Sequence, residues 1–276
     1  MTDSAPHTAW PDRLFAWLRG RQTARWPVLQ VEVTSRCLMR CSFCPNKPLG
    51  AAWQHADLPW EVFRDYLGPH LGRFQPLKVL IDATLGRFEL IYLQGWGEPL
   101  LHRHLWDMVR LAKEAGCRVG FTSCGGLFTE ENVARILAAG VDLLSVSFAG
   151  ASAAVHQALR VGSDFERLAA NVRRLTEQRT GRREAPLHLE LHYLMMRPNM
   201  AELPAFVRLA AELGADEVVA TNLTYAFTPE LDSLRVFGPS PDPAHLALVA
   251  EAEREAARLG IKFRPYGLTT NDAVLA

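Results

Sequence analysis

Three closely spaced cysteines, Cys37, Cys41 and Cys44, are the residues of this chain best suited to chemistry. Their C-x3-C-x2-C pattern follows a strand-like segment at residues 29–34, so three thiolates on one loop can converge on a soft metal centre. A structural zinc site takes four protein ligands, and no second C-x-x-C follows at zinc-finger spacing. A [4Fe–4S] cluster usually takes four cysteines, so three leave one iron open for a catalytic ligand. The pattern favours such a cluster, and a three-thiolate zinc site with water as fourth ligand is an alternative.

The segments around this loop alternate between strand and helix. The strand-like segments are residues 29–34, 89–94, 118–122, 142–147, 187–195, 217–221 and 261–265. The helical patterns are residues 60–70, 104–115, 129–139, 164–179, 201–213 and 242–259. Several strands are apolar at most positions, as buried parallel strands are, and Gly116 and Gly140 follow helices as C-cap glycines do. The alternation predicts an α/β fold with a parallel sheet, either open or curled into a partial or closed barrel. The cysteine loop then lies at the C-terminal end of a strand, where α/β proteins place their sites.

The segment before the first strand, residues 1–27, is predicted to form a short N-terminal helix. Leu14, Trp17 and Leu18 have the i, i+3, i+4 spacing of one apolar helix face. We expect this face to dock on the main domain, although its aromatic and arginine residues also suit a partner surface.

The composition excludes several classes of protein. The chain has 276 residues with 30 basic and 30 acidic side chains, and this balance argues against nucleic-acid or anionic-membrane binding. No apolar run approaches the roughly 18 residues that cross a bilayer, and the polar start does not resemble a signal peptide. Five cysteines, three of them clustered, do not suit a secreted disulfide scaffold. The sequence therefore predicts a cytoplasmic protein.

The cysteine motif, with Phe43 before its third cysteine, resembles the signature of radical S-adenosylmethionine (radical SAM) enzymes. Further segments resemble that family in the same order along the chain: Gly95-Trp96-Gly97-Glu98-Pro99, Thr122-Ser123-Cys124-Gly125 and Ser145-Val146-Ser147-Phe148-Ala149-Gly150. The resemblance covers roughly residues 29–225 and implies a partial (β/α)6 TIM-like barrel. It divides the chain into an N-terminal helical extension (1–27), a radical SAM core (28–225) and a C-terminal helix and strand (226–276) that complete or follow the barrel.

The resemblance also implies roles for residues near the cluster. The three cysteines bind three irons and leave the fourth for the amino and carboxylate groups of SAM. Phe43 lies against the adenine, and Glu98 accepts a hydrogen bond from the ammonium of the methionine part. Gly95 and Gly97 let backbone approach a ligand closely. Without the cysteines, a Gly/Pro cluster after a strand would be read as an ordinary turn.

Two further residues are implied to contact the SAM carboxylate or ribose, Ser147 and Arg160. A guanidinium suits a carboxylate because it donates paired hydrogen bonds, although an arginine at a helix end is as often simply solvated. The chain departs from the family pattern at Trp96, Cys124 and Ala149, where a small residue, an asparagine and an aspartate are usual. These departures affect the assignments in the SAM pocket but not those of the cluster.

The resemblance implies that the reduced cluster cleaves SAM to a 5′-deoxyadenosyl radical that abstracts a substrate hydrogen. An external donor of the flavodoxin or ferredoxin type would supply the electron. The stretch 187–225 is similar to peptide- and protein-modifying enzymes of the SPASM or twitch branch, yet no cysteine follows Cys124 to bind auxiliary clusters. We therefore expect a peptide or protein substrate. The alternatives are cofactor biosynthesis on a small molecule and a non-catalytic iron–sulfur or regulatory protein.

Overall fold

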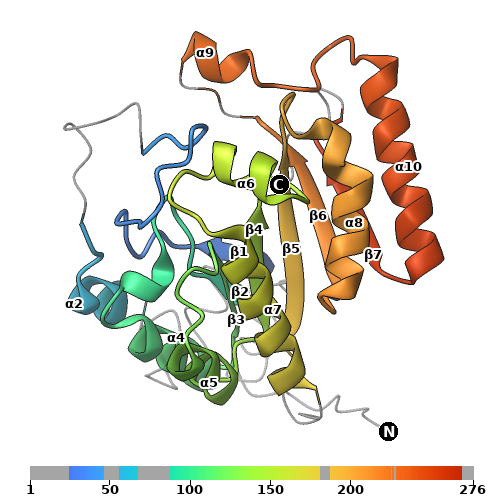
Figure 1. The fold of residues 1–276 in the computed structure, drawn as a ribbon. Coiled ribbons are helices and arrows are strands. Elements are labelled where there is room, and N and C mark those ends of the chain that lie inside the picture. The colour runs from blue at the N-terminus through green and yellow to red at the C-terminus, as the bar shows by residue number, and fades with distance from the viewer. Residues whose placement is uncertain are drawn as a thin grey trace, which may run out of the picture.

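Seven parallel strands form one curved sheet (Figure 1). The computed structural model describes residues 25–46, 56–67, 87–180, 187–224, 226 and 228–268. The strands are β1 (Arg25–Gln30), β2 (Arg87–Tyr92), β3 (Arg118–Ser123), β4 (Leu143–Phe148), β5 (His188–Met195), β6 (Glu217–Asn222) and β7 (Lys262–Tyr266). Their order in the sheet is their order along the chain, and every neighbouring pair is parallel. This topology confirms the predicted α/β partial barrel, in which β7 extends the sheet beyond β6.

The helices pack mainly on the outer face of this sheet, and the short helix at 229–232 lies beyond the ends of the strands (Figure 1). They are α2 (Trp60–Val62), α4 (Leu105–Glu114), α5 (Glu130–Ala138), α6 (Ala153–Leu159), α7 (Phe165–Arg179), α8 (Leu203–Glu212), α9 (Pro229–Asp232) and α10 (Pro243–Leu259). Local sequence sets many of their ends: the Thr129 hydroxyl accepts from the Asn132 N–H at 3.2 Å to open α5, and Gly260 ends α10 at a φ of 70°. Within the described residues, no helix is long and apolar enough to cross a membrane.

Two short helices were not predicted from the sequence. Helix α6 has only seven residues, too few to show a clear period, and Ser152 caps it by accepting from Val155 N at 3.4 Å. Helix α9 lies in the proline-rich stretch 229–243, between two predicted elements, where Pro229 occupies the first turn and Thr228 is the cap. Proline is compatible with a first helical turn because that N–H has no intrahelical acceptor.

The first strand begins four residues earlier than predicted, at Arg25 rather than at residue 29. Residues 25–27, assigned from the sequence to the N-terminal extension, thus belong to the sheet, and the helix expected around residues 14–18 lies outside the described residues. Beyond β1 the chain turns to a different partner: Leu58 N donates to Val33 O at 2.8 Å, and Thr34 pairs with Asp57. A strand-like run can pair with a loop segment as well as with a sheet, which sequence pattern does not distinguish.

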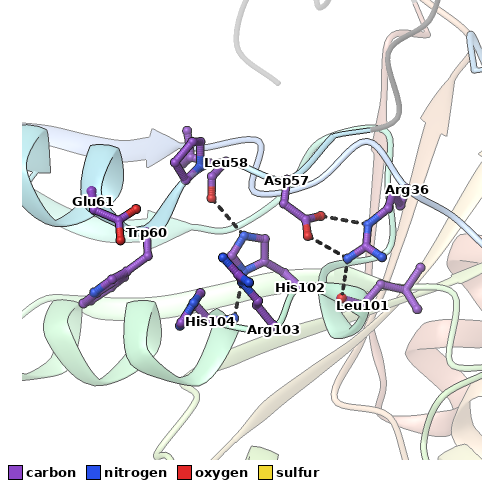
Figure 2. Close-up of a pocket in the computed structure, with 10 residues that line it drawn as sticks. Arg36, Asp57, Leu58, Trp60, Glu61, Leu101, His102, Arg103 and His104 are labelled. Atoms are coloured by element: carbon purple, nitrogen blue, oxygen red, sulfur yellow. Dashed lines mark hydrogen bonds and ion pairs between the residues drawn. The ribbon is translucent and has the colours of Figure 1, made fainter.

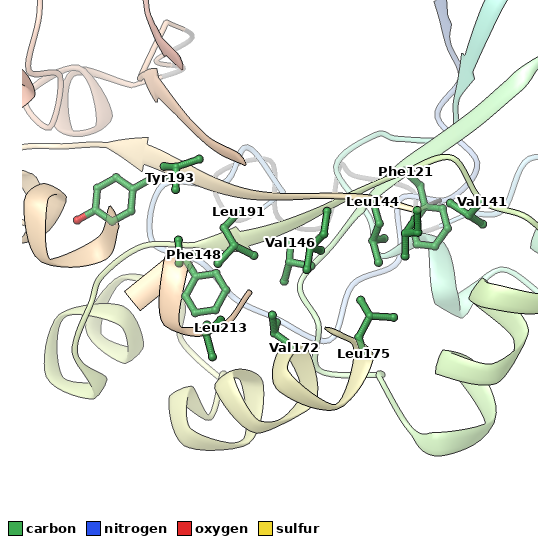
Figure 3. Close-up of a cluster of buried hydrophobic side chains, with 14 of the residues drawn as sticks. Phe121, Val141, Leu144, Val146, Phe148, Val172, Leu175, Leu191, Tyr193 and Leu213 are labelled. Carbon is green, nitrogen blue, oxygen red and sulfur yellow. The ribbon is translucent and has the colours of Figure 1, made fainter. Parts of the chain in front are cut away.

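The hydrophobic core lies between the sheet and its helices (Figure 3). On β4, Leu144, Val146 and Phe148 are fully buried on this side and pack with α7 residues such as Val172. Burying each such side chain contributes about 1.5–3 kcal/mol. The alternate residues of β4 and β5 point to the inner, concave face, which is polar. The strands are therefore not apolar on both faces, because the inner face lines the interior of an incomplete barrel.

Candidate functional site

The cysteine loop (residues 36–44) follows β1. Its first residue, Arg36, is held by an ion pair and hydrogen bonds (Figure 2). The Arg36 guanidinium donates to both carboxylate oxygens of Asp57, at 2.9 and 2.7 Å, and to Leu101 O at 2.8 Å. Burial would raise the pKa of Asp57, but hydrogen bonds from Arg36 and Thr34 outweigh it and hold the pKa below its ordinary value. Asp57 therefore stays ionised, and the residue before Cys37 is held in place.

The cavity beside the Arg36–Asp57 pair has a volume of about 530 Å³ and is lined by Arg36 and by residues 57–61 and 101–104 (Figure 2). Its central histidine already has partners at both ring nitrogens: His102 Nε2 donates to Leu58 O at 3.0 Å, and His102 Nδ1 accepts from His104 N at 3.1 Å. No cysteine lines this cavity. It belongs to the support of the loop rather than to the thiol site.

The far side of the cysteine loop is bonded to the end of α6. Arg40 N donates to Val161 O at 2.8 Å, and Ser42 N donates to Leu159 O at 2.9 Å. Within the loop, Cys44 N donates to Cys41 O at 3.3 Å. Helix α6, which was not predicted from the sequence, therefore fixes the geometry of the cysteine loop.

The three thiols are close enough to act on one another electrostatically. Burial raises the pKa of Cys37 to about 11, opposed by an N–H from Met39 and reinforced by Glu98, Cys41 and Cys44. Burial also raises the pKa of Cys44, with Cys41 adding to it. Ionisation of Cys37 and Cys44 is therefore favoured by a cationic centre bound beside them, and thiolate sulfur is the ligand of iron–sulfur clusters. The donor set fits a cluster bound through three cysteines.

Two of the predicted SAM-pocket residues meet at this loop, Phe43 and Arg160. The guanidinium carbon of Arg160 lies 5.5 Å from the centre of the Phe43 ring, and Nη1 donates to Cys41 Sγ at 3.9 Å. Arg160 Nε is buried without a hydrogen-bond partner among the described residues. A buried donor left unpaired costs about 1–3 kcal/mol, so this position is suited to receiving an acceptor. The structure thus brings Arg160 to Cys41, which is 119 positions away in the sequence.

The carboxylate of Glu98 is directed at protein groups. It is 1% exposed, and it accepts from Cys124 N at 2.7 Å and from Leu100 N at 3.3 Å. Burial raises the pKa of Glu98, while hydrogen bonds from Cys124 and Ser123 lower it. The carboxylate joins the turn after β2 to the turn after β3, and its contact with the SAM ammonium stays a prediction.

Other parts of the chain lie close to the two glycines of the same segment, and at Gly97 the neighbour is backbone, so glycine is required there. A Cβ on Gly97 would lie 2.7 Å from the carbonyl oxygen of Arg36, and one on Gly95 would overlap the Glu32 side chain. Trp96 N also donates to Glu32 Oε1 at 2.8 Å. The close approach observed at these glycines is to the chain between β1 and Cys37, and their approach to a bound ligand stays a prediction.

Ser147 lies on the inner face of β4, opposite His192 of β5 in the sheet register. The His192 Nε2 atom is 3.3 Å from Thr221 Oγ1 of β6. Burial and the charge of Arg160 lower the pKa of His192 to about 4, so the imidazole is neutral near pH 7. Sequence reasoning gave His192 no role; its alternation with the core-facing residues of β5 was the available signal.

Elsewhere on the inner face, ion pairs join β5, β6 and β7, and a hydrogen bond adds β4. Glu190 accepts from Ser145 Oγ at 2.6 Å and from Arg264 Nη2 at 3.2 Å. Glu217 pairs with Arg264 and lies 3.0 Å from His188 Nε2. The histidine and two carboxylates have a spacing that suits a metal ion, but Arg264 already forms ion pairs with both carboxylates. The interior of the partial barrel is therefore polar and cross-linked.

Comparison with known proteins assigns the class. The family description "Radical SAM superfamily" matches residues 31–210, so the chain belongs to this superfamily. Its members use a [4Fe–4S] cluster and S-adenosylmethionine, in agreement with the thiol site above.

Particular relatives define the neighbourhood within the superfamily. The chain is 28% identical over 208 residues to the tungsten-containing aldehyde ferredoxin oxidoreductase cofactor-modifying protein of Pyrococcus furiosus, covering 73% of this chain and 52% of that protein. It is 28% identical over 198 residues to the PqqA peptide cyclase of Granulibacter bethesdensis, covering 71% and 47%. The crystal structure of Streptococcus suis SuiB bound to S-adenosylmethionine has the same fold, with a TM-score of 0.65, 12% identity and coverage of 93% and 54%. The chain spans about half the length of the curated relatives that it matches.

Proposed function

We propose that this chain is the catalytic core of a radical SAM enzyme. The observation that carries the proposal is the loop after β1, where three cysteines lie close enough for their charges to interact and where Arg160 contacts both Cys41 and Phe43. When bound, the reduced cluster supplies the electron that cleaves SAM to methionine and a 5′-deoxyadenosyl radical, which abstracts a hydrogen atom from the substrate.

The residues of this chain hold and orient the reactants. Cys37, Cys41 and Cys44 would bind three irons and leave the fourth for SAM. Arg160 and Ser147 would contact the SAM carboxylate or ribose, and Phe43 the adenine. The polar inner face below them would offer hydrogen-bond donors and acceptors to a polar substrate.

The proposed substrate is a peptide or a protein side chain. Relatives of this chain include PqqA peptide cyclases, and SuiB has been crystallised with its precursor peptide SuiA, which supports this class. The cofactor-modifying relative from Pyrococcus furiosus supports the second candidate, a reaction on a small cofactor precursor. An external one-electron donor of the flavodoxin or ferredoxin type and a cytoplasmic location are parts of the same proposal.

Anaerobic reconstitution of the wild type and of Cys41→Ala tests this function. The wild type should bind about four iron and four sulfide per chain and release 5′-deoxyadenosine from SAM under reducing conditions. Cys41→Ala should do neither, and Cys117→Ala, which changes a buried cysteine outside the loop, should do both. A single zinc per chain would contradict the cluster, and a loaded wild type that leaves SAM intact would support the non-catalytic alternative.

A further inference from the structure

Arg160 is held against the cysteine loop by its backbone. Its N–H donates to His156 O at 2.8 Å, and its carbonyl oxygen accepts from the N–H and the hydroxyl of Ser163, at 3.0 and 2.6 Å. The residues on either side, Leu159 and Val161, accept hydrogen bonds from the loop itself. These hydrogen bonds of the main chain fix the position from which the Arg160 side chain extends.

The side chain of Arg160 is directed at sulfur. Its Nη1 lies 3.9 Å from Cys41 Sγ, within the range of a hydrogen bond to sulfur, and its plane is supported by the Phe43 ring. Cys41 is the buried thiol of the three, so this donor acts in a medium where water screens charge weakly. A charged N–H donor to a thiolate is stronger than a neutral one.

Arg160 differs in sign from the other charges that act on the cysteine loop. Glu98 acts with its negative charge on Cys37, and Glu32 acts on Cys44. Arg160 is the cation among the described side chains that act most strongly on Cys44, and its Nη1 also lies against Cys41. The nearby imidazoles, His156 and His192, are neutral near pH 7 because burial and Arg160 itself lower their pKa values.

We propose that Arg160 tunes the reduction potential of the cluster, through its fixed positive charge and its N–H donation to the Cys41 sulfur. The inference rests on the proposed function and goes beyond the contact with SAM predicted for this residue. Reduction adds one electron from the external donor to the cluster, and no proton is transferred. A cation and a donor at a ligating sulfur stabilise the more negative, reduced form and raise the potential. Arg160 is therefore a positioning and tuning residue that makes the cluster easier to reduce.

The test is a redox titration of the reconstituted cluster in the absence of SAM, followed by electron paramagnetic resonance. Arg160→Gln should shift the midpoint potential to a more negative value, and Arg160→Lys should fall between Arg160→Gln and the wild type. The control is Arg135→Gln, which removes a surface ion pair with Glu131 on α5 and should leave the potential unchanged. SAM affinity is measured on the same samples by equilibrium binding.

The outcomes separate this inference from the proposed function. A loaded Arg160→Gln with the wild-type potential overturns the inference, even if SAM binds more weakly, because the residue then acts on SAM alone. If Arg160→Gln does not bind the cluster, Arg160→Lys decides the question. A midpoint potential more negative than that of the wild type supports the inference, and an unchanged potential overturns it. A wild type that binds no iron overturns the proposed function, and the inference with it.

Discussion

The two faces of the same sheet differ in almost every physical respect. Along β4, Leu144, Val146 and Phe148 face the helices and are fully buried among apolar side chains, whereas Ser145 and Ser147 alternate with them and face a polar interior. The outer face contributes hydrophobic stabilisation, and the inner face holds groups that can meet a ligand. The difference teaches that in this partial barrel stability and chemistry are carried by neighbouring residues of one strand, separated by the alternation of the pleat.

The largest stability effect should come from the outer face. Phe148 is fully buried and packs against Phe165 and Phe206, with ring centres 6.2 and 5.3 Å away. Phe148→Ala should lower the free energy of unfolding by about 3–5 kcal/mol, because it removes buried area and leaves a cavity. Urea denaturation measures the loss. Ser147→Ala, one position away on the inner face, is the matched control and should cost less than about 1 kcal/mol.

Acid pH should separate the faces through His156, a histidine buried on the outer side. Burial and the charge of Arg160 lower its pKa to about 3, so the folded state keeps it neutral while the unfolded chain protonates it below pH 6.5. Its contribution is present above pH 6.5 and is lost as the pH falls toward 3. The loss should reach about 2–3 kcal/mol between pH 7 and pH 4.5.

The variant that checks this is His156→Asn, whose side-chain oxygen can replace Nδ1 as acceptor of the Ala149 N–H, now at 3.3 Å. Thermal unfolding between pH 7 and 4.5 should show a shallower decline in Tm than the wild type. An identical decline in both proteins would mean that another group controls acid stability.

The smallest effect should come from the inner-face ion pairs. Arg264 is 51% exposed, so solvent reaches the guanidinium end of its pairs with the buried Glu190 and Glu217 and screens them in part. Arg264→Met should therefore lower the free energy of unfolding by about 1 kcal/mol. Denaturation at low and high salt measures it, and the difference from the wild type should shrink at high salt. A loss comparable to that of Phe148→Ala would contradict the division of roles between the faces.

Local sequence determined much of the fold. The strand at 118–122 and the helix at 164–179 were predicted to within a residue or so, because hydrophobic period, N-caps and C-cap glycines act over a few positions. The cysteine motif is equally local, because its three cysteines lie within eight residues. The cluster ligands could therefore be proposed without a structure.

Other features depended on contacts between distant parts of the chain, and only the tertiary structure decided them. The sequence does not reveal that α6 fixes the cysteine loop, that Glu98 accepts from Cys124, or that Arg160 reaches Cys41 from 119 positions away. The polar inner face and the apolar outer face also become distinct only when the strands have assembled into a curved sheet. Long-range partners are chosen by packing and register, which arise only when the strands assemble, and so the site's electrostatics are a property of the folded barrel.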